Sequence, residues 1–408
     1  MNLSTVGRVV IIDDVYKETQ PLLEVLGKHQ IPYLYLDGKA EHLPDSPFSG
    51  IRFVFMDIEL SGGFAGQDVK TKASGITAIL EKIISKQNGP YVIIAWTKHT
   101  EVIKQVVENC RTLNIHPVQT LDLEKTECLK SNDVISYLTQ KLSDVLQETG
   151  AFQLYVDWEN MLNVSAKDFI LKFSSFYPVD NKWSRNTENL FYKLYKSYVE
   201  KNELIDKDEQ IRCSLHLLNR SYLDALENVT STYVRSKNFQ LTGGRIDKEI
   251  IAKLNLSLFM ISNPNIPKSP GSIYEETNNN LLKHLKQTCF KRISTSPKNF
   301  RLCKMIITPE CDIAQNKLTM NRLVYGVFFK AHSEIQPKDS QDIFRIGPFW
   351  FKGEIYQIIL SFQSITSSFP ENINDKKRLF AVRRDLLFDI QSKAANHVNR
   401  LGNYQLES

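Results

Sequence analysis

The sequence predicts an α/β fold with a doubly wound parallel sheet of five strands, followed by a helical segment and a β-rich C-terminal unit. Three observations predict this order. Short β-branched runs alternate with amphipathic stretches in the first third, helical spacing dominates the middle, and strand-like runs return after residue 300. We therefore expect domains at 1–150, 151–265 and 266–408, the last closed by a C-terminal helix.

Five apolar runs in the first third have the length and composition of buried strands. They are "GRVVIIDD" (7–14), "IPYLYLDG" (31–38), "GIRFVFMDIEL" (50–60), "YVIIAWT" (91–97) and "IHPVQTLDL" (115–123). Apolar residues three and four positions apart predict helices over 16–30, 73–89, 100–114 and 132–150. Strands that alternate with helices in this way favour a parallel sheet with helices on both faces.

The rest of the chain changes character twice. Helical spacing continues over 151–177, 188–232 and 245–263. The segment "NPNIPKSPGS" (263–272) is rich in Pro, Asn and Ser, which indicates a boundary. Strand-like runs follow at 300–317, 322–332 and 342–362, and helical spacing over about 375–402 predicts the closing helix, with Leu379 and Val382 on its buried face.

Composition limits the class of protein. The chain has 408 residues, 42% of them hydrophobic and 24% charged, which is ordinary for globular domains. We find no signal-peptide pattern at the N-terminus and no apolar run near the roughly 20 residues that a membrane span needs. The six cysteines are scattered, without a CxxC pair, which favours a reducing compartment. We therefore expect a cytoplasmic protein without a membrane segment.

The charge is divided unevenly along the chain. Residues 1–150 hold 15 basic and 19 acidic side chains, a net of −4, and residues 151–408 hold 36 and 27, a net of +9. The basic surplus leaves nucleic acid as an alternative partner. However, the basic residues spread along the chain and no helix-turn-helix signature accompanies them. The basic part could instead dock onto the acidic N-terminal domain of the same chain.

Acidic and hydroxyl side chains follow three of the predicted strands. Asp13 and Asp14 end the first strand, Asp57 ends the third, and Thr97 ends the fourth. Because ligands collect at the carboxyl ends of parallel strands, we expect these residues to meet at one edge of the sheet. Three carboxylates at one point require a cation, and hard oxygen ligands suit Mg²⁺. One carboxylate could then act as a nucleophile toward a phosphoryl group.

These residues resemble those of two-component receiver domains, which have a flavodoxin-like fold. "VVIIDD" is similar to the family's first strand, "FVFMDIEL" to the strand with the phospho-acceptor aspartate, and "VIIAWT" to the fourth strand. The resemblance implies that Asp13 and Asp14 bind Mg²⁺, that Asp57 accepts phosphate from a histidine kinase or a similar ATPase, and that Thr97 is the switch hydroxyl. It implies a response-regulator-like signalling protein, a phospho-acceptor rather than a classical enzyme.

The sequence departs from the receiver pattern in two places. The family's Lys-Pro after strand five is missing from "HPVQTLDLEKTE", so Lys125 is the nearest candidate for the lysine that pairs with the phosphoryl group, and Lys98 is another. A Gly-rich loop, 61–75, is inserted after Asp57. A pseudo-receiver that only docks a partner, without phosphoryl transfer, therefore stays open as an alternative.

Two stretches, "QIPYLYLDG" and "NGPYVIIAWTKH", also resemble proteins of bacterial conflict and antiphage islands that begin with a divergent response receiver. This resemblance implies a role in antiphage defence. It covers about residues 7–150 and implies nothing about the activity of the output region, which would be residues 151–408.

Outside this region, "ITPECDIAQNK" (307–317) is chemically suggestive. Cys311 could be a nucleophile oriented by Asp312, which would make the C-terminal unit an enzyme. Alternatively, Cys311 could bind a metal together with Cys303, His332 or His397. A third interpretation is structural, with Asp312 in a turn and Cys311 as a small buried apolar residue.

Overall fold

The structure, a computed structural model, describes residues 9–60, 67–96, 100–147, 150–198, 206–236, 243–261, 270–293, 300–309, 320–331, 335–369 and 378–398. The chain is divided into two compact units. The first comprises Met1–Phe173 and Tyr222–Ser236, and the second comprises Ser174–Ser221 and Lys237–Ser408. The predicted helical segment is thus shared between the two units, and the three-domain division stays a prediction.

The first unit contains the predicted parallel sheet. Its strands are β1 (Val9–Ile12), β2 (Tyr33–Leu36), β3 (Phe53–Met56), β4 (Val92–Ala95) and β5 (Gln119–Asp122). Their order is β2-β1-β3-β4-β5 and all neighbours are parallel. This is the strand order of flavodoxin-like sheets, so the predicted receiver-like fold class is confirmed.

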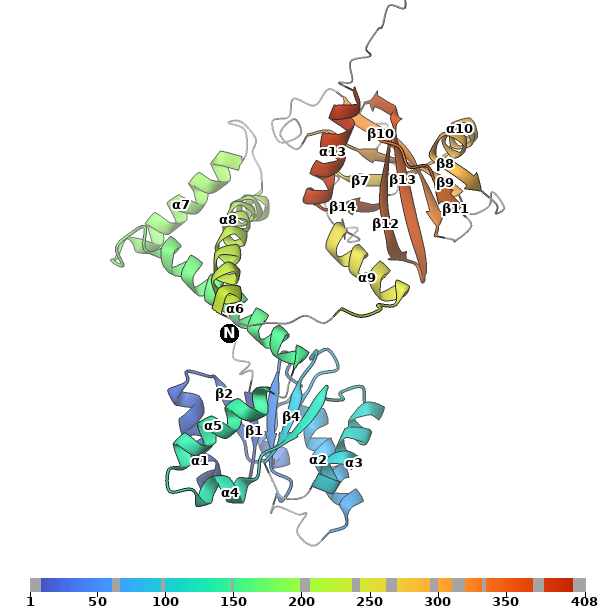
Figure 1. The fold of residues 1–408 in the computed structure, drawn as a ribbon. Helices are drawn as coiled ribbons and strands as arrows, with labels where there is room; N and C mark the ends of the chain where they lie inside the picture. Colours follow the sequence, from blue (N-terminus) through green and yellow to red (C-terminus); the bar gives the residue numbers. More distant parts are fainter. Residues whose placement is uncertain are drawn as a thin grey trace, which may run out of the picture. The chain divides into compact units, whose positions relative to one another are not determined.

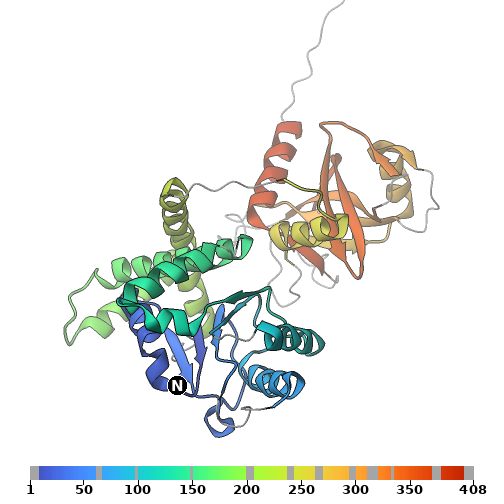
Figure 2. The same ribbon diagram turned by 60° about the horizontal axis from the view of Figure 1, so that its bottom comes forward.

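Helices cover both faces of this sheet (Figures 1 and 2). They are α1 (Tyr16–Lys28), α2 (Val69–Ile83), α3 (Thr100–Thr112), α4 (Lys125–Lys130) and α5 (Val134–Gln147). Successive strand residues point to opposite faces, so Ile12 and Met56 pack with α2 and α3, whereas Ile11 and Phe55 pack with α1 and α5. The three central strands β1, β3 and β4 are therefore apolar and buried along their whole length, as in sheets buried on both sides, whereas the edge strand β5 contains Gln119, Thr120 and Asp122.

The connection between β2 and β3 has a 3₁₀ helix, η1 (Ala40–His42), in place of an α-helix. The backbone of this connection, at Phe48, is hydrogen-bonded to the end of α2. Phe48 N–H donates to the carbonyl of Ile83 at 2.7 Å, and Phe48 O accepts from Ser85 N–H at 2.9 Å. These bonds satisfy backbone groups that an irregular segment would otherwise leave unpaired.

Two longer helices extend the first unit. They are α6 (Ala151–Ser174) and α8 (Lys207–Ser236), whose second half belongs to this unit. Phe152 and Val156 of α6 pack into the same apolar cluster as α1 and α5. Tyr222 of α8 donates to the carbonyl of Leu162 at 3.0 Å. The start of α6 is therefore part of the receiver-like core.

The second unit is built on an antiparallel sheet of seven strands in the order β12-β13-β10-β9-β7-β14-β6. The strands of this unit are β6 (Met260–Ile261), β7 (Ser272–Glu276), β8 (Phe290–Ile293), β9 (Phe300–Ile306), β10 (Asn321–Lys330), β11 (Ile335–Pro337), β12 (Ile343–Phe351), β13 (Glu354–Ser368) and β14 (Arg378–Val382), of which β8 and β11 form a separate pair. Its helices are α7 (Trp183–Tyr198), α9 (Lys248–Phe259), α10 (Asn279–Cys289) and α13 (Arg384–Val398), together with the first half of α8. The predicted β-rich C-terminal unit is confirmed.

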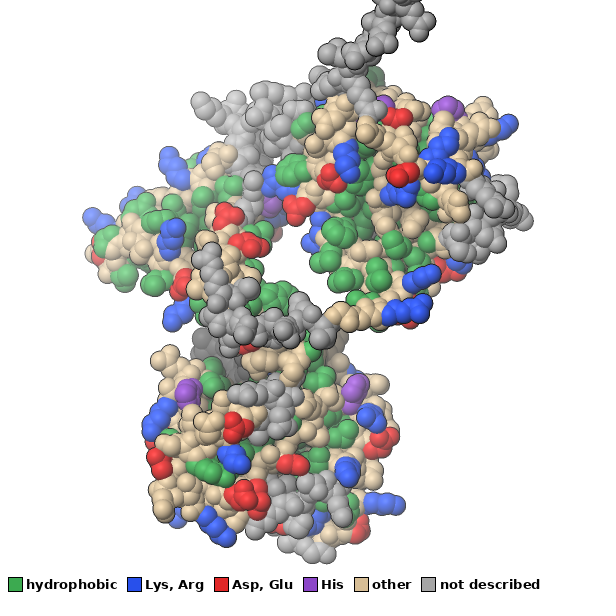
Figure 3. All heavy atoms as spheres, viewed as in Figure 1, with side chains coloured by type: hydrophobic (Ala, Val, Ile, Leu, Met, Phe, Trp, Pro, Cys, Tyr) green, Lys and Arg blue, Asp and Glu red, His purple; other side chains and the backbone are tan. Residues whose placement is uncertain are grey.

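Two apolar clusters lie on opposite faces of this sheet. One contains Ile390 of α13 and Met260, and the other contains Leu285 of α10. On the side shown in Figure 3, the Lys and Arg side chains of this unit lie in several separate places among acidic and apolar ones. None of the helices within the described ranges has the length and apolar character needed to cross a membrane.

The predicted closing helix is wrong at its beginning. Residues 378–382 are strand β14, which pairs with β6 and β7, and the helix begins only at Arg384. The apolar spacing of Leu379 and Val382 fits a helix, but Phe380, Ala381 and Val382 are all buried beside neighbouring strands. Hydrogen bonding to strands far away in the sequence decided this segment, and local spacing does not report such pairing.

Candidate functional site

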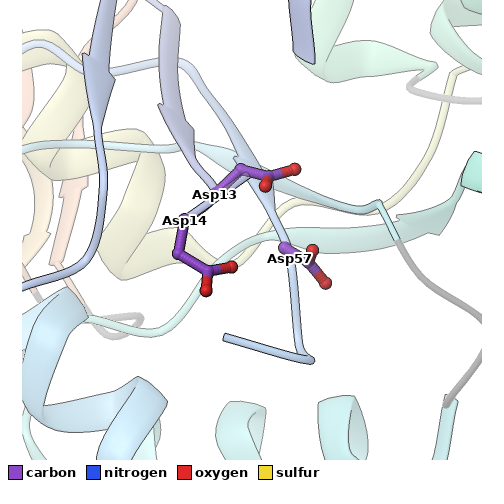
Figure 4. A group of neighbouring side chains, drawn as sticks. All are labelled: Asp13, Asp14 and Asp57. Atoms are coloured by element: carbon purple, nitrogen blue, oxygen red, sulfur yellow. The ribbon is translucent and has the colours of Figure 1, made fainter. Parts of the chain in front are cut away.

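The predicted acids of the first unit meet at the carboxyl edge of the parallel sheet. Asp13 and Asp14 directly follow β1, and Asp57 directly follows β3 (Figure 4). The strand pairing continues one residue further, since Asp57 N–H donates to Ile12 O at 2.9 Å and Asp13 N–H donates to Leu36 O at 3.1 Å. One carboxylate oxygen from each of the three acids lies within 4.8 Å of the others.

Local hydrogen bonds orient two of the carboxylates. Asp13 Oδ1 accepts from Val15 N–H at 2.8 Å, and Asp57 Oδ1 accepts from Glu59 N–H at 2.9 Å. Each is a bond from a side chain to the backbone two residues later, a turn that Asp forms readily. Asp13 is fully buried and Asp57 is 6% exposed. Two acids in such surroundings require compensating positive charge.

Lys125 provides part of that charge. It is the first residue of α4, shortly after β5, and it is buried. Its Nζ lies 2.8 Å from Asp13 Oδ2, 2.9 Å from Asp57 Oδ2 and 2.5 Å from Glu18 Oε2. The sequence lacks the Lys-Pro motif of receiver domains, and Lys125 was the nearest candidate for its lysine. In the structure Lys125 contacts the acids from the first turn of α4. Charge-assisted bonds of this kind are among the stronger hydrogen bonds in proteins.

Burial and charge shift the pKa values of these groups in known directions. Burial raises the pKa of Asp13 to about 6, and the hydrogen bond from Lys125 only partly opposes this effect. Burial by itself would lower the pKa of Lys125, but hydrogen bonds to Asp13, Asp57 and Glu18 outweigh it and raise that pKa. Lys125 is therefore held in its charged form, whereas burial disfavours the charged form of Asp13.

These residues fit a divalent cation. The donor atoms are all carboxylate oxygens, the hard ligands that Mg²⁺ prefers. Around the site are Asp13, Asp14, Asp57 and Glu18, and Lys125 is the cation that contacts three of them. Within the described residues one ammonium faces Asp13, Asp57 and Glu18, which leaves an excess of negative charge, and burial raises the pKa of Asp13. Asp13, Asp14 and Asp57 are the residues that could hold the ion.

Glu18 is the site residue that sequence reasoning missed. It lies in the first turn of α1, four residues after Asp14, and its side chain is 46% exposed. An acid in a first helical turn has an ordinary explanation, because it interacts favourably with the helix dipole. Its contact with Lys125 is visible only in the folded structure, where the first turn of α1 lies beside the start of α4.

Several predicted residues lie outside the described residues. These are Thr97 and Lys98 near the end of β4, His332, and Cys311 with Asp312. Of the predicted Gly-rich loop, 61–75, residues 61–66 are outside the described residues, and the prediction is wrong for residues 69–75, which form the start of α2. The nucleophile and metal hypotheses for Cys311 and Asp312, and nucleic-acid binding by the C-terminal unit, stay predictions. Cys303 is fully buried on β9, and His397 Nδ1 lies 3.1 Å from Asp342 Oδ1.

No family model matches the sequence, and no curated protein matches it. The structure is similar to a response regulator from Thermotoga maritima, with 14% identity and a TM-score of 0.21, over 35% of this chain and 99% of that chain. It is also similar to a response regulator protein from Burkholderia pseudomallei with a phosphorylated aspartic acid, calcium ion and citrate, with 16% identity and a TM-score of 0.22, over 39% and 84% of the two chains.

A third similar structure is NtrX from Brucella abortus in complex with ADP, with 11% identity and a TM-score of 0.18, over 47% of this chain and 34% of that chain. At these identities and TM-scores, the similarities carry no argument about function. The proposals below therefore rest on the site of this chain and on the motifs in its sequence.

Proposed function

We propose that Asp57 accepts a phosphoryl group from a phosphohistidine of a partner histidine kinase or histidine-kinase-like ATPase, and that the product controls the output region, 151–408. One observation supports this most: three acids lie within 4.8 Å of one another, and a lysine lies 2.9 Å from the acceptor. The chain is then a response-regulator-like signalling protein. A role in antiphage defence belongs to the proposal through the sequence resemblance alone.

In this proposal an oxygen of Asp57 is the nucleophile. Its bond to phosphorus forms while the phosphorus–nitrogen bond of the kinase histidine breaks, and the electron pair of that bond returns to the imidazole nitrogen. Asp13, Asp14 and Asp57 would hold Mg²⁺, which when bound neutralises charge on the phosphoryl oxygens. Lys125 places its ammonium beside Asp57. Thr97 remains the proposed hydroxyl that contacts the product.

Electrostatics explain why the acids alone would not suffice. A phosphoryl group is an anion, and it must approach several carboxylates in a partly buried site where Coulomb repulsion is strong. Lys125 and a divalent ion together supply three positive charges against Asp13, Asp14, Asp57 and Glu18. The phosphoryl group can thus approach Asp57, and Asp57 keeps the negative charge that makes it a nucleophile.

Control of the output region follows from a change in charge. Phosphorylation adds negative charge to a domain of net −4, while residues 151–408 carry +9. We propose that the part of this basic region that belongs to the second unit docks onto the receiver in one state more than in the other, so that phosphorylation shifts the two populations.

The test is incubation of the full chain with acetyl phosphate and Mg²⁺, followed by intact mass measurement. We expect a mass increase of one phosphoryl group that is removed by hydroxylamine, as for an acyl phosphate. Asp57→Ala should lose it completely. Asp122→Asn is the matched control, because Asp122 is exposed at the same edge of the sheet. An increase that survives in Asp57→Ala would contradict the assignment of the acceptor.

One observation favours a second candidate, a pseudo-receiver that binds partners without phosphoryl transfer. Lys125 already lies within 2.9 Å of Asp13, Asp57 and Glu18, so the ammonium alone gives the acids a resident counter-ion. Under this function the wild-type chain takes up no phosphoryl group from either acetyl phosphate or a phosphorylated kinase domain. The mass experiment therefore separates the two candidates.

A further inference from the structure

Three carboxylates compete for one ammonium at the phospho-acceptor site, and they differ greatly in exposure. The Lys125 Nζ lies 2.8 Å from Asp13, 2.9 Å from Asp57 and 2.5 Å from Glu18. The Asp13 side chain is 0% exposed and that of Asp57 is 8% exposed, whereas that of Glu18 is 46% exposed. Glu18 is thus the one partner of the three that water can readily solvate.

An ammonium group has three hydrogens; Asp13 and Asp57 accept two of them, and Glu18 Oε2 lies 2.5 Å from the same nitrogen as an ion-pair partner. A phosphoryl group on Asp57 would bring new anionic oxygens next to the same nitrogen. One existing partner must then give up its contact with the ammonium. Releasing buried Asp13 would leave a carboxylate uncompensated at a high cost, whereas releasing Glu18 exposes it to water.

We propose that Glu18 is a positioning residue that holds Lys125 in the resting state and releases it when Asp57 carries a phosphoryl group. This inference rests on the proposed function and deepens it, because it names a regulatory contact of the same site. The release removes an ionic tie between the first turn of α1 and the first turn of α4. Glu18 thereby couples the chemical state of Asp57 to the surface formed by these two helix starts.

Two consequences follow from the sign of the charges. Glu18 is negative and close to the place of an incoming anion, so it opposes phosphoryl binding both by repulsion and by competing for the ammonium. A neutral side chain of the same size should therefore favour the phosphoryl-like state. The contact is half-exposed, so the effect should have the modest size that is typical of partly solvated ion pairs.

The experiment uses the full chain with Mg²⁺ and beryllofluoride, an analogue of the phosphoryl group, in calorimetric titrations. We expect Glu18→Gln to lower the beryllofluoride concentration at half-saturation by about threefold. Glu24→Gln is the matched control on the same helix, since Glu24 is exposed and pairs only with the exposed Lys28 among the contacts described. It should leave the titration unchanged.

A second measurement separates release of the contact from a general effect on folding. Hydrogen exchange of the amides in the second turn of α1, which donate to the carbonyls of the first turn, should accelerate in the wild type when beryllofluoride is added. In Glu18→Gln this exchange should already be fast and should change little when beryllofluoride is added. The thermal midpoint of this variant should stay within about one degree of the wild type.

The outcomes are distinguishable. If Asp57 takes up phosphate in the wild type but Glu18→Gln binds beryllofluoride no better, the inference is overturned and the proposed function stands. If the wild type neither binds beryllofluoride nor takes up a phosphoryl group, the proposed function is overturned and the inference with it.

Discussion

At the residue scale, the site depends on how one ammonium is shared among several acids. Asp13, Asp14 and Asp57 were predictable, because each directly follows an apolar strand run and the ends of parallel strands lie together. Lys125 was the nearer of two candidates from the sequence, and the structure places its ammonium beside the acids, whereas Lys98 lies outside the described residues. Glu18 carried no signal beyond that of an ordinary acid in a first helical turn.

Replacing the ammonium should separate metal binding from phosphoryl transfer. Lys125→Met removes a positive charge that competes with a divalent ion, so we expect Mg²⁺ to bind at least about threefold more tightly. The same change should slow phosphorylation by acetyl phosphate about tenfold or more, because the phosphoryl oxygens lose a counter-charge. Calorimetric titration with Mg²⁺ and intact mass time courses measure the two effects.

Lys130→Met is the control for this prediction, since Lys130 is exposed in the last turn of the same helix. Lys130→Met should alter neither the affinity for Mg²⁺ nor the rate of phosphorylation by acetyl phosphate. Weaker Mg²⁺ binding in Lys125→Met would show that the ammonium organises the carboxylates for the ion instead of competing with it.

At the element scale, α6 is attached to the sheet through the strand that carries Asp57. Arg52 directly precedes β3, and its guanidinium contacts Glu159 of α6, with an Nη2–Oε1 distance of 2.6 Å and Nε bonds of 3.0 and 3.1 Å. Phe53 and Phe152 pack edge to face beside this pair, with centroids 5.5 Å apart. The strand that ends at Asp57 thus contacts α6 at its other end.

Glu159→Ala should destabilise the first unit by about 1–2 kcal/mol, because it breaks a charge-assisted bidentate pair whose side chains are 12% and 28% exposed. We expect a lower calorimetric midpoint for that unit and faster proteolysis within α6. Glu24→Ala, which removes an exposed pair on α1, should cost no more than about 0.5 kcal/mol. Equal effects of the two substitutions would contradict a special role for the Arg52–Glu159 pair.

At the scale of the whole molecule, two compact units differ in charge and in secondary structure. The acidic cluster belongs to the first unit. A ligand that binds only the native form of one unit stabilises that unit, by about 2.7 kcal/mol when its concentration is 100 times Kd. The second unit should not respond unless the two are coupled.

Scanning calorimetry of the full chain should therefore show two transitions, of which Mg²⁺ raises only one, by about 5 °C. Asp14→Asn should abolish this shift, because it removes one of the three carboxylates that could hold the ion. Asp45→Asn, an exposed position in the same unit, should retain it. An equal Mg²⁺ shift in Asp14→Asn would place the ion elsewhere.

The sequence by itself determined the alternating strands and helices, the parallel sheet and the acids at its edge, because periodicity and strand ends are local signals. Tertiary structure alone decided that the Lys125 ammonium reaches those acids from the start of α4, that Glu18 joins them, and that residues 378–382 form a strand. Each of these depends on segments far apart in the chain, as with Asp13 and Lys125, and the free energy of such contacts arises only when the packed elements bring them together.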